Sequence, residues 1–186
     1  ISLNFCNFLF AKSIEKFSDS KDISNYFSGI IAINDNQFQA SYDYFKSLNN
    51  LEESHYSYSH YYLYSQITLS KFKDAVNYAK KLQIKKLDNF ESNLITGLYY
   101  LEKNDLNRAR IHFEKLENFN KPDTIQSLLS VTLKNWTNFD SINSAISKLE
   151  LMPSSFENIK KIQVLFAHCH FAVSYTHLRA HETRGN

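Results

Sequence analysis

The sequence predicts an all-α protein built from antiparallel helix pairs that stack along the chain as an α-solenoid. Three observations lead to this class. Apolar residues recur at helical spacing, and the pattern of apolar and small positions repeats about every 34 residues. Residues that favour turns are rare, with 3 Gly and 2 Pro in 186 residues, which does not fit an all-β fold.

The repeat is clearest in the second helix of each pair. Ala75 and Ala109 lie 34 residues apart, and the same interval leads from Ala75 back to Ser41. An interval of 36 residues leads on from Ala109 to Ala145. Three further columns keep this register: Phe38, Phe72, Leu106 and Ile142; Phe45, Ala79, Phe113 and Leu149; Leu48, Leu82, Leu116 and Met152. Within each unit the columns are spaced +3, +4 and +3, which places them on one face of a helix.

An earlier helix in each unit repeats in the same way. Its columns are Phe27, Tyr61, Ile95 and Val131; Gly29, Leu63, Gly97 and Leu133; Ala32, Gln66, Tyr100 and Trp136. Short polar stretches at residues 34–36, 70–71, 103–105 and 135–141 separate the two helices. The last stretch is the longest, which accounts for the extra two residues in the fourth unit.

Local signals also mark where helices begin and end. Asp88 with Glu91, and Ser154 with Glu157, have the spacing of a capping box, in which side chains accept from the free N–H groups of the first turn. Pro122 lies between units, where a helix is expected to stop.

A helix–turn–helix period of this length resembles the tetratricopeptide repeat family over about residues 22–152. The third unit matches best, through Gly97, Tyr100, Ala109, Phe113 and Leu116. The tryptophan of the family's first helix is absent, and Leu63 and Leu133 replace an expected small residue. The resemblance implies a right-handed solenoid whose first helices line a concave face that receives a peptide or a partner helix. The alternative is another helical bundle in which the interval is coincidental.

The repeat divides the chain into units at residues 22–52, 53–87, 88–121 and 122–153. Residues 1–20 are predicted to be the second helix of a truncated preceding repeat, because Phe5, Phe8, Leu9 and Ile14 form an amphipathic pattern. Residues 154–172 are predicted to be the first helix of a truncated fifth repeat. Ile162, Leu165 and Phe166 would then be exposed, since no partner helix follows.

The end of the chain is expected to differ in origin from the rest. Residues 173–183 resemble the in-frame translation of a sequencing-library adaptor, and residues 184–186 fit an index barcode read as codons. We therefore expect residues 173–186 to be non-native. For this reason we assign no meaning to His177, His181 and Glu182, which imitate a helical zinc pair.

The predicted function is that of a non-catalytic scaffold that binds another protein or a peptide. The side chains expected to line the groove are Tyr26, Asn34, His60, Tyr64, Glu102, Lys134 and Asn138. Some co-chaperone members of the family grip a C-terminal carboxylate with Lys, Arg and Asn at two columns. Those columns here contain residues such as Leu94, Leu98 and Ser130, so this clamp is absent.

Enzymatic and metal-binding functions are not expected, and neither is any cofactor. The chain contains no GxGxxG, P-loop, GxSxG or HExxH motif. In His168-Cys169-His170, neighbouring side chains on a helix point about 100° apart, which does not suit one tetrahedral ion. Cys6 and Cys169 lie near opposite ends of the chain, which does not favour a disulfide framework.

Charge and hydropathy narrow the possible partners further. The net charge of +2 predicts no strong field for nucleic acid, and no apolar run reaches the roughly 20 residues of a membrane span. Two alternatives stay open: an RNA-binding helical repeat, which would need a Lys/Arg-lined groove, and a structural segment of a larger protein whose other domain carries the activity. The composition suggests a bacterial source, with cytoplasm and periplasm both open.

Overall fold

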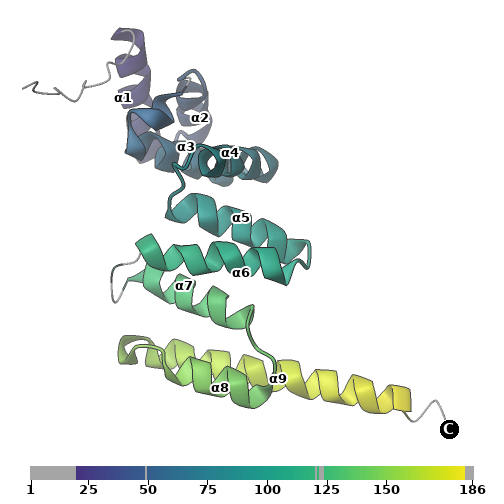
Figure 1. Ribbon diagram of the computed structural model, residues 1–186. Helices are drawn as coiled ribbons and strands as arrows, with labels where there is room; N and C mark the ends of the chain where they lie inside the picture. The colour runs from purple at the N-terminus through teal and green to yellow at the C-terminus, as the bar shows by residue number, and fades with distance from the viewer. Residues whose placement is uncertain (1–19, 49, 120, 122–123, 183–186) are drawn as a thin grey trace, which may run out of the picture. The chain divides into compact units, whose positions relative to one another are not determined.

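The structure is a computed structural model that describes residues 20–48, 50–119, 121 and 124–182, with side chains as far as residue 172. Every regular element in this described part is a helix (Figure 1), which confirms the all-α prediction there. The chain forms two compact units, Ile1–Lys71 and Phe72–Asn186. The helix predicted for residues 1–20 lies almost wholly outside the described residues, and the stacking of all pairs into one solenoid stays a prediction.

Unit 1 contains three helices and a short 3-10 turn. These are α1 (Ser20–Asn34), α2 (Phe38–Lys46), η1 (Leu51–Glu53) and α3 (Tyr56–Thr68). Helix α2 packs against both α1 and α3. Aromatic rings fill this contact: Phe45 is fully buried, stacks on Tyr61 at 6.1 Å and meets Tyr58 edge-on at 6.0 Å. The Tyr58 hydroxyl donates to the carbonyl oxygens of Phe45 and Leu48, each at 2.9 Å, which ties α3 to the end of α2.

Unit 2 contains six α-helices in its described part. They are α4 (Phe72–Ile84), α5 (Phe90–Glu102), α6 (Leu106–Lys115), α7 (Ile125–Trp136), α8 (Ile142–Glu150) and α9 (Glu157–Glu182), with 3-10 turns η2 (Leu116–Phe119) and η3 (Ser154–Phe156). Successive helices from α4 to α9 contact one another. Helix α9 packs along α8 and then extends past it (Figure 1).

Three turns between paired helices share one backbone conformation. Asn36, Ser70 and Asn104 have φ values of 59°, 57° and 58°, and they follow one another at 34-residue intervals. After each of them, the next N–H donates to a carbonyl five residues back: Gln37 to Ala32, Lys71 to Gln66 and Asp105 to Tyr100, at 2.7, 2.8 and 2.9 Å. This is the Schellman ending of a helix, which satisfies carbonyls that the last turn leaves free.

Small residues occur where α1 packs against α2 and where α5 packs against α6. Ser41, Ala75, Ala109 and Ala145 are all fully buried, as their column predicts. A Cβ atom at Gly29 would lie 2.7 Å from the Phe45 ring, and one at Gly97 would lie 2.4 Å from the Phe113 ring. A Cβ atom at either position would therefore require the facing ring to move.

Some apolar positions are more exposed than their columns predict. Phe27 is 56% exposed, although it was expected to face the core. Two residues turn a helix by about 200°, so Phe27 faces away from α2 if Gly29 faces towards it. Phe72 and Leu106 are 60% and 43% exposed because they are the first residues of α4 and α6, at the ends of the packed faces.

Both predicted helix starts need correction. The N-cap of α5 is Asn89, whose Oδ1 accepts from the Ser92 N–H at 2.8 Å, while the Ser92 hydroxyl oxygen accepts from the Asn89 N–H at 2.9 Å. The capping box is thus formed one residue later than Asp88 and Glu91. Residues Ser154–Phe156 form a 3-10 turn ahead of α9, and the Glu157 carboxylate pairs with Lys160 rather than capping.

Helix α9 is longer than the segment predicted for it, because its backbone stays helical beyond residue 172 to Glu182. Its apolar face is exposed as predicted, with Ile162, Leu165 and Phe166 at 52%, 63% and 60%. Whether residues 173–186 are non-native stays a prediction.

Candidate partner-binding surface

Tyr26, predicted to line the groove, is instead a core residue of unit 1. It is 4% exposed, and its ring lies 4.5 Å from the His55 ring and 6.2 Å from the Phe45 ring. Burial, with a smaller contribution from Tyr61, raises the pKa of Tyr26. Its burial leaves little of this ring for a partner to contact in the described fold. The ring packs instead against His55, just before α3, and against Phe45 of α2.

The other predicted residues of unit 1 are accessible. His60 and Tyr64 are exposed on α3, one helical turn apart, and Tyr64 is 45% exposed. Asn34 is exposed at the last residue of α1. The Tyr64 ring meets Phe38 of α2 edge-on at 6.1 Å, which holds it against the second helix while one face stays in solvent. The structure therefore brings His60 and Tyr64 together on one accessible helix face.

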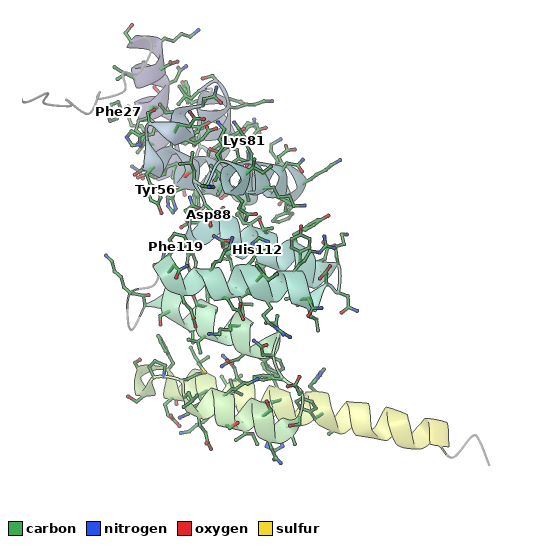
Figure 2. The ribbon with its side chains drawn as sticks, viewed as in Figure 1. Phe27, Tyr56, Lys81, Asp88, His112 and Phe119 are labelled. Atoms are coloured by element: carbon green, nitrogen blue, oxygen red, sulfur yellow. The ribbon has the colours of Figure 1, made fainter. Side chains whose placement is uncertain are left out.

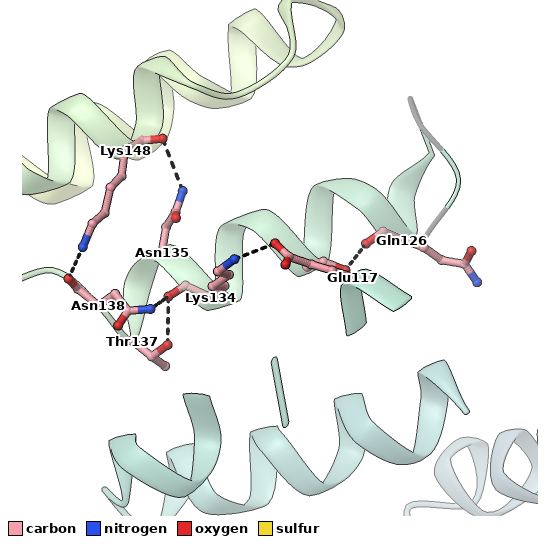
Figure 3. A network of polar contacts seen from close by, with 8 residues as sticks. Glu117, Gln126, Lys134, Asn135, Thr137, Asn138 and Lys148 are labelled. Carbon is pink, nitrogen blue, oxygen red and sulfur yellow. Dashed lines mark hydrogen bonds and ion pairs between the residues drawn. The ribbon is translucent and has the colours of Figure 1, made fainter. Parts of the chain in front are cut away.

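Unit 2 places Lys134 and Asn138 in a polar network (Figure 3). Asn138 Nδ2 donates to the Lys134 carbonyl oxygen at 3.0 Å, and Lys134 Nζ lies 2.8 Å from Glu117 Oε1. Lys148 Nζ donates to the Asn138 carbonyl, which links the end of α7 to α8. These contacts hold the longer turn between α7 and α8, so part of the polar capacity of both residues is used within the fold.

Glu102, the last predicted residue, ends α5 and is exposed. Its Oε1 lies 3.6 Å from Lys103 Nζ, and both side chains are more than half exposed, at 70% and 55%. A pair this exposed contributes little to stability, so Glu102 stays available to a partner. It belongs with Lys134 and Asn138 to unit 2, whereas His60 and Tyr64 belong to unit 1.

Two further accessible side chains were not among the predicted groove residues. Leu98 on α5 is 43% exposed and Ile67 on α3 is 37% exposed. Leu98 occupies the same column as Tyr64, 34 residues later. The repeat spacing was the signal that could have identified Leu98. The prediction missed it because the predicted groove residues are all polar or aromatic, whereas leucine is aliphatic.

A half-buried histidine forms a second polar cluster in unit 2, between α5 and α6 (Figure 2). His112 Nδ1 lies 3.3 Å from Asn93 Oδ1, and Asn93 Nδ2 donates to Asp88 Oδ2 at 2.9 Å. The His112 ring stacks on Tyr100 at 5.6 Å. Burial, assisted by Lys115 and Lys80 and opposed by Asp88, lowers the pKa of His112. The neutral imidazole is therefore the favoured form in the fold.

The described residues contain no group of three or more His, Cys, Asp or Glu side chains close enough to hold a metal ion. Cys169 is a free thiol on the exposed side of α9. Among the helices described, none combines the length and apolar character needed to cross a bilayer.

At the repeat register the accessible side chains are an aromatic one, Tyr64, on α3 of unit 1 and an aliphatic one, Leu98, on α5 of unit 2. Each of them can contact apolar groups of a ligand. Compared with models of protein families, with curated proteins and with solved structures, the chain has no match.

Proposed function

We propose that this chain is a non-catalytic scaffold of tetratricopeptide type that binds a peptide segment of another protein through the exposed faces of its first helices. The observation that carries the proposal recurs in each unit: Tyr64 of unit 1 and Leu98 of unit 2 occupy the same column of the repeat, on α3 and α5, and are 45% and 43% exposed. Exposed aromatic side chains such as Tyr64 are frequent anchors in protein interfaces.

The backbone supports the repeat on which this function depends. The second helices α2, α4, α6 and α8 begin at Phe38, Phe72, Leu106 and Ile142, at the intervals of 34, 34 and 36 residues by which a repeat array is recognised. The Gly29–Phe45 and Gly97–Phe113 approaches recur at the same register. Rigid pairs of this kind present their first helices without a large ordering cost on binding.

The energetic contribution of the two side chains can be bounded. Complete burial of one aliphatic or aromatic side chain stabilises by about 1.5–3 kcal/mol. Because Tyr64 and Leu98 are already more than half covered, each would add about 1 kcal/mol on burial by a ligand. A contact of this size corresponds to roughly a fivefold change in Kd.

The proposal is tested with peptides selected from a phage-displayed random library against the purified chain. The binding of a fluorescein-labelled selected peptide is measured by anisotropy for Tyr64→Ala, Leu98→Ala and the double variant. We expect at least one of the two single changes to weaken binding about threefold or more, and the double change to weaken it at least as much. Matched controls are Ile84→Ala on α4 and Ile111→Ala on α6, which are 83% and 54% exposed on second helices.

The controls distinguish binding to the first helices from non-specific hydrophobic binding. If Ile84→Ala or Ile111→Ala weakens binding as much as the first-helix variants, the first helices are not the binding face. If no library peptide is retained above an unrelated helical protein, the scaffold proposal fails.

A further inference from the structure

We propose that a cluster of cations and tyrosines on α4, α5 and α6 is a second docking surface, which takes an acidic peptide segment. The cluster consists of Lys80, Tyr99, Tyr100, Lys103 and Arg108, all within unit 2. We refer to it as the basic–aromatic cluster. The cluster shares α5 with Leu98 but contains neither Leu98 nor Tyr64, so separate variants test the two proposals.

The tyrosine pair organises the cluster. The rings of Tyr99 and Tyr100 lie 5.3 Å apart at 68° to each other. Lys80 Nζ from α4 lies 4.2 Å from the Tyr99 centroid and 5.3 Å from the Tyr100 centroid. Arg108 Cζ from α6 lies 4.4 Å from the Tyr100 centroid, and Lys103 Nζ lies 5.9 Å from the Tyr99 centroid. All four distances are within the range of cation–π attraction, so two rings gather three cations from separate elements.

Internal acids neutralise only part of this charge. Arg108 pairs with Asp105 at 2.5 Å, and Lys103 lies 3.6 Å from Glu102. Lys80 has no carboxylate within ion-pair distance in the described part of the chain, and its contacts are with the rings. Lys80 is thus the cation of the cluster whose charge is not balanced by a carboxylate of the described residues.

The sequence around Lys80 strengthens the positive field. Residues 72–87 contain five lysines against one aspartate, an excess of four positive charges, whereas the whole chain has a net charge of only +2. Lys81, on α4 (Figure 2), and Lys86 are both exposed. This local excess of positive charge along the chain adds to the attraction of an anionic partner.

The geometry favours carboxylates over a nucleic acid strand. Single-stranded nucleic acid is held largely by bases that stack on free aromatic faces, and the faces of Tyr99 and Tyr100 are occupied by Lys80 and Arg108. Glu102 and Asp105 at the rim would also repel a continuous row of phosphates. A peptide can place its Asp and Glu residues next to the cations and leave gaps opposite these two acids.

The test uses the full chain and a fluorescein-labelled eight-residue peptide of alternating Glu and Gly, with a labelled eight-nucleotide oligouridylate as the second probe. Anisotropy is measured at 50 and 300 mM NaCl for the unchanged chain and for the double variant Lys80→Gln/Lys103→Gln. We expect the acidic peptide to bind at 50 mM NaCl, to weaken at least tenfold at 300 mM, and to weaken at least fivefold in the variant.

The control is Lys121→Gln/Lys161→Gln, which removes the same charge from exposed lysines away from the cluster; it should change the affinity less than twofold. Circular dichroism of both variants checks that the helices are intact. The proposal is overturned if the peptide does not bind at 50 mM NaCl, if the control loses as much affinity as the cluster variant, or if oligouridylate binds more tightly with the same dependence on Lys80 and Lys103.

Discussion

Gly97 allows α5 to lie against the ring of Phe113, and replacing it with alanine tests this packing directly. A Cβ atom at residue 97 would lie 2.4 Å from Phe113 Cε1 and 2.7 Å from Cδ1. Ordinary contact begins at about 3.4 Å, so the ring would have to move by about 1 Å. Phe113 is fully buried and packs with Leu94, Ala109 and Leu116, so it has no empty space to enter.

Two opposing effects decide the size of the change. Overpacking a core position costs about 1–3 kcal/mol, and the full displacement of a buried ring belongs in the upper part of that range. Alanine is favoured over glycine within a helix by about 1 kcal/mol. We therefore expect Gly97→Ala to lower the free energy of unfolding by about 1–2 kcal/mol, although the same change at an open helical site would raise it.

The measurement is urea unfolding followed by far-UV circular dichroism, with Phe113→Leu as the second arm of a double-mutant cycle. Leucine removes the ring atoms that Cβ would meet, so Gly97→Ala should cost at least about 1 kcal/mol less in the Phe113→Leu background. The reasoning would be refuted if Gly97→Ala stabilised the chain, or if its effect were the same beside phenylalanine and leucine. Gly29→Ala, whose Cβ would lie 2.7 Å from Phe45, is the matched change in unit 1.

Three further predictions concern local features. Asn89→Ala removes the buried cap of α5 and should lower the free energy of unfolding by about 1–2 kcal/mol, whereas Asp88→Ala should cost less; urea unfolding compares the two. Ser70→Gly removes the strain of a left-handed φ of 57°. It should raise the midpoint of thermal unfolding and add at most about 1 kcal/mol to the free energy of unfolding, whereas Ser70→Val should lower both. Because the pKa of His112 is lowered in the fold, the unfolded chain binds the extra proton at a higher pH than the folded chain does. The free energy of unfolding should therefore fall as the pH drops below about 6.5 and through the pKa of the folded state. His112→Gln should reduce this pH dependence in thermal unfolding measured from pH 7.5 to 5.

Local signals predicted the helices and their turns well. The predicted breaks at residues 34–36, 70–71 and 103–105 coincide with the ends of α1, α3 and α5, because a helix end depends on a few consecutive residues. The column of Ser41, Ala75, Ala109 and Ala145 is fully buried, as its regular spacing predicted. Within the pairs α1 and α2, and α5 and α6, small side chains fit where the two helices pack together.

The sequence could not show which of two adjacent residues of similar type caps a helix or is buried. Asp88 and Asn89 are both good N-caps, and the choice of Asn89 depends on how α5 packs and on the Ser92 partner. Tyr26 and Phe27 are neighbouring aromatics, yet one is 4% and the other 56% exposed. Neighbouring side chains point in different directions around a helix, and the packing of α1 on α2 and α3 decides which of the two rings is buried.

The sequence by itself determined the helical class, the places where helices end and the small residues between them, since each of these follows from spacing within a few turns. Only the tertiary structure decided which polar side chains form contacts within the fold and which stay accessible to solvent. Lys134 is paired with Glu117, 17 positions away, while Lys80, Tyr99 and Arg108 meet from three helices. Such contacts depend on how helices pack across the chain, and no periodicity within a single helix specifies them.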